Sequence, residues 1–493
     1  MKTMKNIKIY TGLIVIAAML TMNSCKKDFL DVNTDPNNPI DVTSELILPP
    51  AIAHTAFITG GTYQVITGFW AQYWTQGSTG NQYNIYDQYQ IPNTTFDRQW
   101  VELYSDVLED FKVLSEKGIS ENKPNYTAIA YIMEAYVFHV LTDLHGDIPY
   151  SEALQGLNNI APHFDSQQSI YDGLIVMIDK GISNIDYDAS AFVPGADDFI
   201  YHGDMELWER FANSLKLRIY MRQSEVRPGV AQAGISSLYT NGAIFLEDGM
   251  DAEMHFVNSV GYEHPLYTEF INLGRQNIMA SNTILNYMIA NGDLRIDAFF
   301  TPATTGPNAG SHAGIDQGDG KTPTFPSDAT PNDFSQPSDL IAGGDAAAVF
   351  MSASETYFLL SEAAARGWIA DDAQALYEAG ITSSFLRWEF SETDASDYYA
   401  LPQIAFPAAG SQDDKVKAII TEKWVANCGN QSIEGWNDWR RTGYPDFFTV
   451  SLTSLIAPGS YPQRLPYPNS EIQTNQNTPA QPDITAKVWW DVN

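Results

Sequence analysis

The sequence predicts a mostly α-helical fold, made of helix pairs and interrupted by a large irregular portion. Apolar residues recur every three or four positions over two long stretches, about 97–222 and 350–445, a pattern typical of amphipathic helices. Glycine and proline punctuate both stretches and divide them into helices with short connections. A composition of 44% hydrophobic and 18% charged residues in 493 positions indicates a globular protein with a sizeable core.

The first 24 residues have the pattern of an export signal. Three early lysines precede an apolar run over 9–20, which is too short for a bilayer core that needs about 20 residues. The run ends in TMNSC, residues 21–25, which resembles the lipobox of bacterial lipoproteins. We therefore expect cleavage after residue 24 and lipidation of Cys25. A plain signal-peptidase site, with Cys25 as a bystander, is the alternative.

Behind Cys25 we expect a tether over residues 25–45, and then one domain over 46–493. Asp, Asn and Pro dominate 31–39, which favours irregular turns. The only other cysteine is Cys428, so disulfides are not expected to hold the fold, and Cys428 is predicted to be a small buried side chain.

The charge balance excludes one class of partner. Lys and Arg number 27 against 60 Asp and Glu, which gives a net charge of −33. Because nucleic-acid binding depends on basic side chains that displace counterions from phosphates, nucleic acid is a poor partner.

The first helical stretch contains four periodic segments. The second segment is apolar on nearly all sides, as expected for a helix packed between neighbours, whereas the other three carry one apolar stripe each. In chain order, the segments are marked by Trp100, Leu103, Val107 and Phe111; by residues 128–144; by Tyr171, Leu174, Ile178 and Ile182; and by Trp208, Phe211, Leu215 and Ile219.

The second stretch continues the pattern. Ser352 and Glu355 form a capping-box pattern that opens one helix. A helix over about 373–388 follows, with Gly380 at a position where a neighbour could approach closely, and another begins near Val416. Helix pairs in which large aromatics alternate with small residues resemble tetratricopeptide repeats.

Two regions depart from helical periodicity, and we expect the ligand site there. Residues 60–92 are dense in aromatic and amide side chains and nearly free of charge. Within 255–345, six prolines between 301 and 345 exclude a long helix or a central strand. Irregular segments of this length in compact domains usually carry function or are disordered.

The first region supplies the side chains that carbohydrate sites use. Aromatic rings stack on the apolar faces of sugars, while amide and guanidinium groups bind their hydroxyls. A core stripe is the alternative for the residues with helical spacing, Phe69, Trp70, Tyr73 and Trp74. A structural role is also the alternative for Tyr83 and Tyr86, and a structural ion pair is the alternative for Arg275. The predicted ligand-binding residues are Trp70, Trp74, Asn81, Tyr83, Tyr86 and Arg275.

Enzyme signatures are mostly absent from the sequence, so no cofactor, metal or catalytic residue is predicted. His139 and His145 lack metal-site spacing, and residues 318–322 lack the first glycine of a phosphate-binding loop. Asp143 and Asp147 could be the carboxylate pair of a glycoside hydrolase. A helix end with a capping aspartate explains the two residues more simply.

Several stretches together resemble the SusD/RagB family of surface lipoproteins, the partners of TonB-dependent transporters in the outer membrane of Bacteroides-type bacteria. The resemblance spans most of the chain after the signal and depends on the order and spacing of its motifs. These are CKKDFLDVNTDPNNP at 25–39, HGDIPYSE at 145–152, WERFANSLKLRIYMR at 208–222, GDLR at 292–295, YFLLSEAA at 357–364, GWNDWRRTGYP at 435–445 and PQRLPYP at 462–468.

The resemblance implies a scaffold of four tetratricopeptide-like units and an irregular portion that carries the ligand site. It implies a lipid-anchored protein on the extracellular face of the outer membrane that captures oligosaccharide and delivers it to a SusC-like TonB-dependent transporter, without catalysis. Some members bind peptides, and the only aromatics in 301–345 are Phe325 and Phe334, so a peptide ligand stays open. A helical-scaffold glycoside hydrolase and a scaffold for protein contacts alone are the further alternatives.

Overall fold

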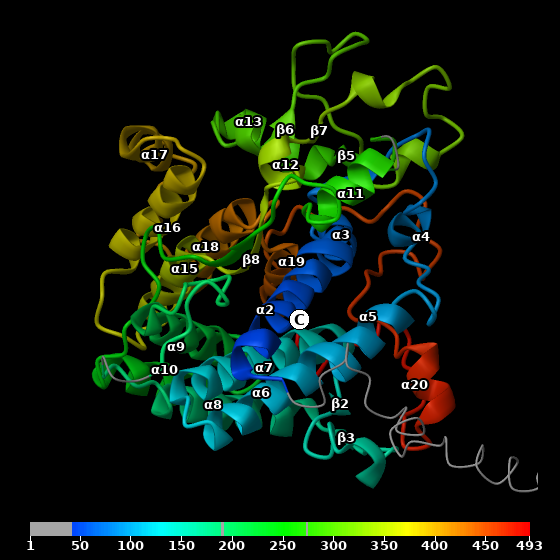
Figure 1. Cartoon of the computed structure of the whole chain (residues 1–493). Helices are drawn as coiled ribbons and strands as arrows, with labels where there is room; N and C mark the ends of the chain where they lie inside the picture. The colour runs from blue at the N-terminus through cyan, green and yellow to red at the C-terminus, as the bar shows by residue number, and fades with distance from the viewer. Residues whose placement is uncertain (1–41, 189–191, 273–274) are drawn as a thin grey trace, which may run out of the picture.

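The computed structural model describes residues 42–188, 192–272 and 275–493 (Figure 1). Helices dominate these residues and strands are few and short, which confirms the predicted mostly α-helical class. The predicted export signal over 1–24, the predicted lipidation site Cys25 and the turns expected over 31–39 lie outside the described residues, as does most of the tether expected over 25–45.

The described chain begins with a helical rod through the middle of the molecule (Figure 1). The rod comprises α2 (Ser44–Ile58), the π-helical turn η2 (Thr59–Tyr63) and α3 (Gln64–Trp70). Every residue of α3 is buried, and α3 packs against α19 (Ser432–Thr442). The expectation that 60–92 is irregular throughout was therefore wrong for its first third. That part forms a central helix that is buried on nearly all sides.

The four predicted helical segments of the first stretch form, and each helix packs on the next: α6 on α7, α7 on α8, and α8 on α9. A further helix, α10, lies beyond the predicted end at about 222 and packs on α9. The first helix of the stretch contains a π-helical turn, η3, between α5 and α6. The bounds are α5 (Asp97–Glu102), η3 (Leu103–Leu108), α6 (Glu109–Ser120), α7 (Pro124–His145), α8 (Gln167–Ser183), α9 (Met205–Met221) and α10 (Pro228–Thr240).

The second stretch contains α15 (Ala353–Ala365), α16 (Ala373–Arg387), α17 (Glu392–Tyr399), α18 (Gln412–Ala426) and α19. The predicted close approach at Gly380 is present, because a Cβ there would lie 3.0 Å from the Phe358 ring. Ser352 caps α15 by accepting a hydrogen bond from the Glu355 N–H at 3.1 Å. The capping-box prediction was wrong in its other half, a hydrogen bond from the Ser352 N–H to the Glu355 carboxylate. This carboxylate instead accepts from Arg218 Nε at 2.9 Å.

The strands form four antiparallel pairs in the described part of the chain. One pair, β1–β5, aligns Trp74 with Ala280 and so ties the early loop to the middle segment. The pairs are β1 (Trp74–Gln76) with β5 (Ile278–Ala280), β2 (Ile148–Pro149) with β3 (Phe164–Asp165), β4 (Ala252–His255) with β8 (Ala347–Met351), and β6 (Phe300–Thr301) with β7 (Gln336–Pro337).

The remaining helices are short. The middle segment with α11 to α13, β6 and β7 gathers at one end of the molecule, above the central rod in Figure 1. The bounds are α4 (Asn84–Asp87), α11 (Pro265–Asn272), α12 (Asn282–Asn291), α13 (Ile296–Phe299), α14 (Asp339–Ala342) and α20 (Asn469–Thr474), with single 3₁₀ turns at Gly156–Asn158, Asp319–Lys321 and Pro331–Asp333.

A buried ionic network joins α7, α9 and α19. Arg222 Nε donates to Asp143 at 3.1 Å, and the same guanidinium pairs with Glu434. Asp143 also accepts from the Trp490 indole at 2.9 Å, which fixes the last turn of the chain. Burial alone would raise the pKa of Glu434, but Arg222, with Arg218 and Lys423, holds it well below its usual range.

Candidate functional site

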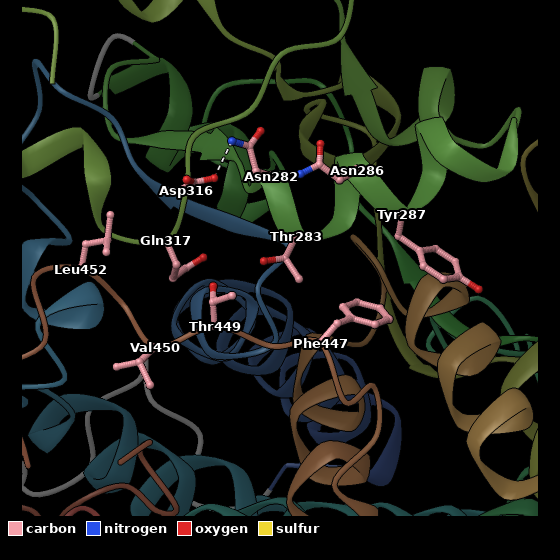
Figure 2. A pocket seen from close by; sticks show the side chains of 10 residues that line it. All are labelled: Asn282, Thr283, Asn286, Tyr287, Asp316, Gln317, Phe447, Thr449, Val450 and Leu452. Carbon is pink, nitrogen blue, oxygen red and sulfur yellow. Dashed lines mark hydrogen bonds between the residues drawn. The ribbon is translucent and has the colours of Figure 1, made fainter. Parts of the chain in front are cut away.

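One open cavity among the described residues has a volume of about 490 Å³, within the usual range for small-ligand pockets. We call it the α12 pocket. Three chain segments that are distant in sequence form its walls (Figure 2). The lining residues are Asn282, Thr283, Asn286, Tyr287, Asp316, Gln317, Phe447, Thr449, Val450 and Leu452.

The first wall is the beginning of α12. Ser281 caps this helix by accepting from the Thr283 N–H at 3.2 Å. Helical spacing places Asn286 beside Asn282 and Tyr287 beside Thr283, and all four residues line the pocket (Figure 2). Asn282 Nδ2 donates to Asp316 Oδ1 at 2.7 Å, so the helix and the opposite loop hold each other in place.

The second wall is the segment 447–452, after the last long helix. The Phe447 ring stacks on Tyr287, with centroids 5.5 Å apart and an interplanar angle of 18°. Phe447 is 37% exposed, so part of its ring is available to a ligand. The wall therefore offers an apolar surface beside the amide and hydroxyl groups of α12.

Gln72 fastens the first two walls together from behind. Its side chain is buried, accepts from Thr283 Oγ1 at 2.7 Å and from the Thr449 N–H at 3.1 Å, and donates to the Thr449 carbonyl at 2.7 Å. Gln72 has a φ of 59°, a left-handed conformation that is uncommon outside glycine. The three side-chain hydrogen bonds offset the cost of this backbone conformation. They also hold the first and second walls of the pocket at a fixed separation.

The third wall is the loop that carries Asp316 and Gln317. Gln317 Nε2 donates to the carbonyls of Phe69 and Trp74, each at 3.1 Å, and to Asp87 at 2.8 Å. Its Oε1 is buried and has no donor within the described protein. In Figure 2 this oxygen points toward Thr283 across the pocket, where a ligand N–H or O–H could reach it.

Asp87 beneath this wall is expected to make stability pH-dependent. Burial raises the pKa of Asp87 to about 6, although Gln76, Thr75 and Gln317 donate hydrogen bonds to it. The folded state therefore keeps this carboxyl protonated at pH values where the unfolded chain, with a pKa near 3.8, has lost the proton. Its contribution is present below about pH 4 and is lost as the pH rises to about 6.

The test compares the wild type with Asp87→Asn in urea unfolding between pH 4 and pH 7. The free energy of unfolding of the wild type, relative to the variant, should fall by about 2–3 kcal/mol over this range. A difference that stays constant with pH would contradict the assignment.

Two predicted platform residues belong to the core. Trp70 and Trp74 are 3% and 1% exposed, and their indoles donate to the carbonyls of Tyr86 at 3.1 Å and Val65 at 2.9 Å. The core-stripe alternative is therefore the one observed for Trp70 and Trp74, and also for Phe69 and Tyr73, which are fully buried. The prediction that a ligand stacks on Trp70 or Trp74 is therefore wrong, because other protein atoms already cover both indole rings.

Tyr83 and Tyr86 form a stacked pair, with centroids 5.2 Å apart, and are 5% and 6% exposed. The Tyr83 hydroxyl donates to Glu269, and burial raises the pKa of Tyr83 far above its ordinary value. The prediction that Tyr83 and Tyr86 are exposed stacking platforms is therefore also wrong. Asn81 is exposed, and its side-chain oxygen accepts from Asn84 at 3.2 Å.

Arg275 forms an ion pair with Asp339 at 2.8 Å, and its side chain is 36% exposed. It does not line the α12 pocket. The salt-bridge alternative therefore describes its observed contact. Arg275 and Tyr83 line one common cavity, but its volume is only about 10 Å³, and the other four predicted ligand-binding residues are not part of its lining.

The sequence predicted the location of one part of the α12 pocket and not of the other. Six of the ten lining residues lie within 255–345, one of the two regions expected to carry the ligand site. Phe447, Thr449, Val450 and Leu452 were missed. The available signal was FFTV at 447–450, an uncharged aromatic segment just after a predicted helix end.

The carboxylate pair weighed for a hydrolase does not form an open site. Asp143 is fully buried, and Asp147 accepts from the Gln167 N–H at 2.8 Å. The α12 pocket has one carboxylate among its lining residues, Asp316, whereas glycoside hydrolysis normally uses two. The predicted burial of Cys428 is confirmed.

The irregular loops enclose a second open cavity of about 850 Å³. Thr305 to Asn308 and Pro326 to Phe334 contribute its lining. The Phe334 ring lies 5.6 Å from that of Phe325, so the two aromatics noted in this segment pack on each other.

Fold and pocket together define a helical-repeat protein with an open, amide-rich ligand pocket. The family model described as "Starch-binding associating with outer membrane" (SusD-like) matches residues 36–468. The chain therefore belongs to the SusD-like family. Among proteins with curated functions, none matches it.

Solved structures agree with this membership. A chitin-binding protein is 26% identical, with a TM-score of 0.79 over 92% of this chain and 100% of the other. A chitin-binding SusD homologue from Flavobacterium johnsoniae is 25% identical, with a TM-score of 0.75 over 91% and 99%. A SusD homologue from Bacteroides fragilis, 22% identical, has a TM-score of 0.74 over 92% and 99% and supports the fold.

Within the described ranges, no helix is both long enough and apolar enough to cross a membrane. In the same part of the chain, no cluster of three or more His, Cys, Asp or Glu side chains is arranged to hold a metal ion.

Proposed function

We propose that this protein captures a neutral oligosaccharide in the α12 pocket, without catalysing a reaction on it. The observation that carries the proposal is the lining: amide and hydroxyl groups on the first and third walls, the exposed part of the Phe447 ring on the second wall, and a single charged residue. Such a surface matches a ligand with apolar C–H faces and many hydroxyls.

Chitin-type oligosaccharides, which carry N-acetyl groups, are the proposed ligand class. Two relatives of 25–26% identity are described as chitin-binding. The unsatisfied Gln317 Oε1 could accept from the N–H of an acetamido group, and the amide of Asn286, on an exposed residue, could donate to its carbonyl. Peptide is the alternative ligand, and it is less favoured because no Lys or Arg lines this pocket to bind a carboxylate.

Calorimetry with a ligand panel tests this proposal. We expect N-acetylglucosamine oligosaccharides to bind, maltooligosaccharides to bind more weakly, and tetrapeptides not to bind. Binding of peptides without any glycan would overturn the carbohydrate assignment, while tighter binding of maltooligosaccharides would overturn only the preference for chitin-type ligands.

We further propose that Cys25 is lipidated and holds the protein on the outer face of the outer membrane, where it delivers the ligand to a SusC-like TonB-dependent transporter. Support comes from the motif TMNSC before a tether rich in Asp, Asn and Pro, and from membership in a family described as associating with the outer membrane. Triacylation would supply the multiple chains that stable anchoring requires.

Replacing the anchor residue tests this part. In cells, Cys25→Ala should move the protein from the outer-membrane fraction to the soluble fraction and abolish palmitate labelling, while Cys428→Ala should leave both unchanged. Co-purification of the wild type with a transporter of this class is also expected. Persistent membrane association of Cys25→Ala, without label in the wild type, would contradict lipidation.

A further inference from the structure

A third cavity lies away from the α12 pocket, and the two share no lining residue. We call it the β4 cavity, because β4, α14, the start of β8 and the end of α16 form its walls. Its volume is about 310 Å³. In contrast to the α12 pocket, its lining is rich in ionisable groups: Glu253, His255, Asp339, Asp345, Arg387 and Glu389.

The cationic groups of this cavity are already engaged. Arg387 pairs with Glu253 at 2.6 Å and with Asp251 behind it. His255 Nε2 lies 2.9 Å from Glu253, and Arg275 pairs with Asp339 at 2.8 Å.

Two further carboxylates, those of Asp345 and Glu389, are exposed and form no ion pair with any described residue. Asp251, Glu253 and Asp339 bring the carboxylates to five, against at most three cations, the two arginines and His255. The cavity is therefore negative even when His255 is protonated, and it attracts a cation.

Apart from Asn430, the rest of the lining is apolar and includes Leu340, Ala347 and Trp388. Leu340 is 58% exposed. The Trp388 indole N–H is buried and has no acceptor within the described protein. A ligand that combines a cationic head, an apolar stem and a nearby carbonyl oxygen would satisfy all three features, and a lysine or arginine residue within a peptide has this combination.

An exposed apolar loop begins and ends at the same wall. The Phe256 N–H donates to the Ala346 carbonyl at 3.2 Å, and the His264 N–H donates to the Gly344 carbonyl at 3.0 Å. Between these anchors, Val257, Val260 and Tyr262 are 61%, 92% and 71% exposed. Exposed apolar side chains grouped in this way are typical of protein contacts.

We propose that the β4 cavity and the loop 257–262 form a docking surface for a basic segment of a partner protein. A lysine or arginine side chain of the partner enters the cavity, and apolar residues beside it in the partner sequence pack on Val260 and Tyr262. The arrangement gives the protein a second binding surface, independent of the α12 pocket.

The test uses a synthetic peptide with one arginine flanked by leucines, and the same peptide with citrulline, which has nearly the same shape but no charge. Binding is followed by NMR through the Trp388 indole signal, assigned with Trp388→Phe, and by calorimetry. We expect the arginine peptide to shift this signal and to bind at least about tenfold more tightly than the citrulline peptide, a difference of about 1.4 kcal/mol. The preference should weaken with added salt.

Variants separate the two halves of the surface. Asp345→Asn with Glu389→Gln should remove the preference for arginine, and Val260→Ser with Tyr262→Ser should weaken the peptide but not N-acetyl-arginine amide. The matched control is Asp397→Asn with Glu116→Gln, two exposed acidic residues outside the cavity, which should change nothing. Glycan binding at the α12 pocket checks that each variant is folded.

Three outcomes would overturn the proposal: equal binding of the arginine and citrulline peptides, equal effects of the cavity and control variants, or binding of N-acetyl-arginine amide as tightly as the peptide. The last would make the cavity a site for a small free cation and not a docking surface for a protein.

Discussion

Arg222→Met is expected to lower the free energy of unfolding by about 3–5 kcal/mol, because it removes the cation from a buried network and leaves its anions in place. Arg222 is 2% exposed and pairs with Asp143 and Glu434, which are both buried. Methionine preserves much of the aliphatic stem, so the loss of charge and hydrogen bonds, and not of volume, dominates the effect.

Lys417→Met provides the matched control. Lys417 and Asp446 form an ion pair at 2.5 Å, but their side chains are 46% and 51% exposed, and exposed pairs contribute about 0–1 kcal/mol. Urea unfolding of the two variants and the wild type should therefore separate them by several kcal/mol. Similar stabilities of the two variants would show that the buried network does not hold α7, α9 and α19 together.

Phe447→Ala is expected to weaken oligosaccharide binding about tenfold or more, which corresponds to about 1.4 kcal/mol. Its ring is the exposed apolar surface of the α12 pocket and stacks on Tyr287, which also holds Glu422 through its hydroxyl at 2.7 Å. Alanine would remove the face on which a sugar ring can stack and would leave a wider pocket.

The control for this variant is Phe199→Ala, at a phenylalanine that is 39% exposed, compared with 37% for Phe447, and that does not line the pocket. Calorimetry should show unchanged affinity for Phe199→Ala, and thermal unfolding should confirm that both variants are folded. Unchanged affinity in Phe447→Ala would place the ligand elsewhere.

The scaffold was predictable because its signals are local. The periodic stripes that contain Trp100, Tyr171 and Trp208 each became one helix or one continuous helical run, and the small residue Gly380 marked a real close approach. Each of these sequence patterns spans only a few turns of one helix, so it can be recognised without knowledge of the rest of the chain.

The site was less predictable because its signals are not local. The side chain of Gln72 and the backbone of Thr449 meet across 377 positions, and no pattern within either segment indicates the other. The aromatics of 70–86 were ambiguous for a different reason. Helical spacing and an aromatic-rich composition fit both a core and a sugar platform, and the choice depends on whether another segment covers the rings. The carbonyl of Ala71 accepts from the Trp424 indole at 2.8 Å, which shows how the distant α18 closes over this region.

The most direct measurement is a crystal structure of the protein with a bound chitin-type oligosaccharide. We expect sugar density between α12 and the segment 447–452, with one ring against Phe447 and hydrogen bonds to Asn286 and Gln317. Density only in the loop cavity at 305–334, or only in the β4 cavity, would contradict the central claim that the α12 pocket is the carbohydrate site.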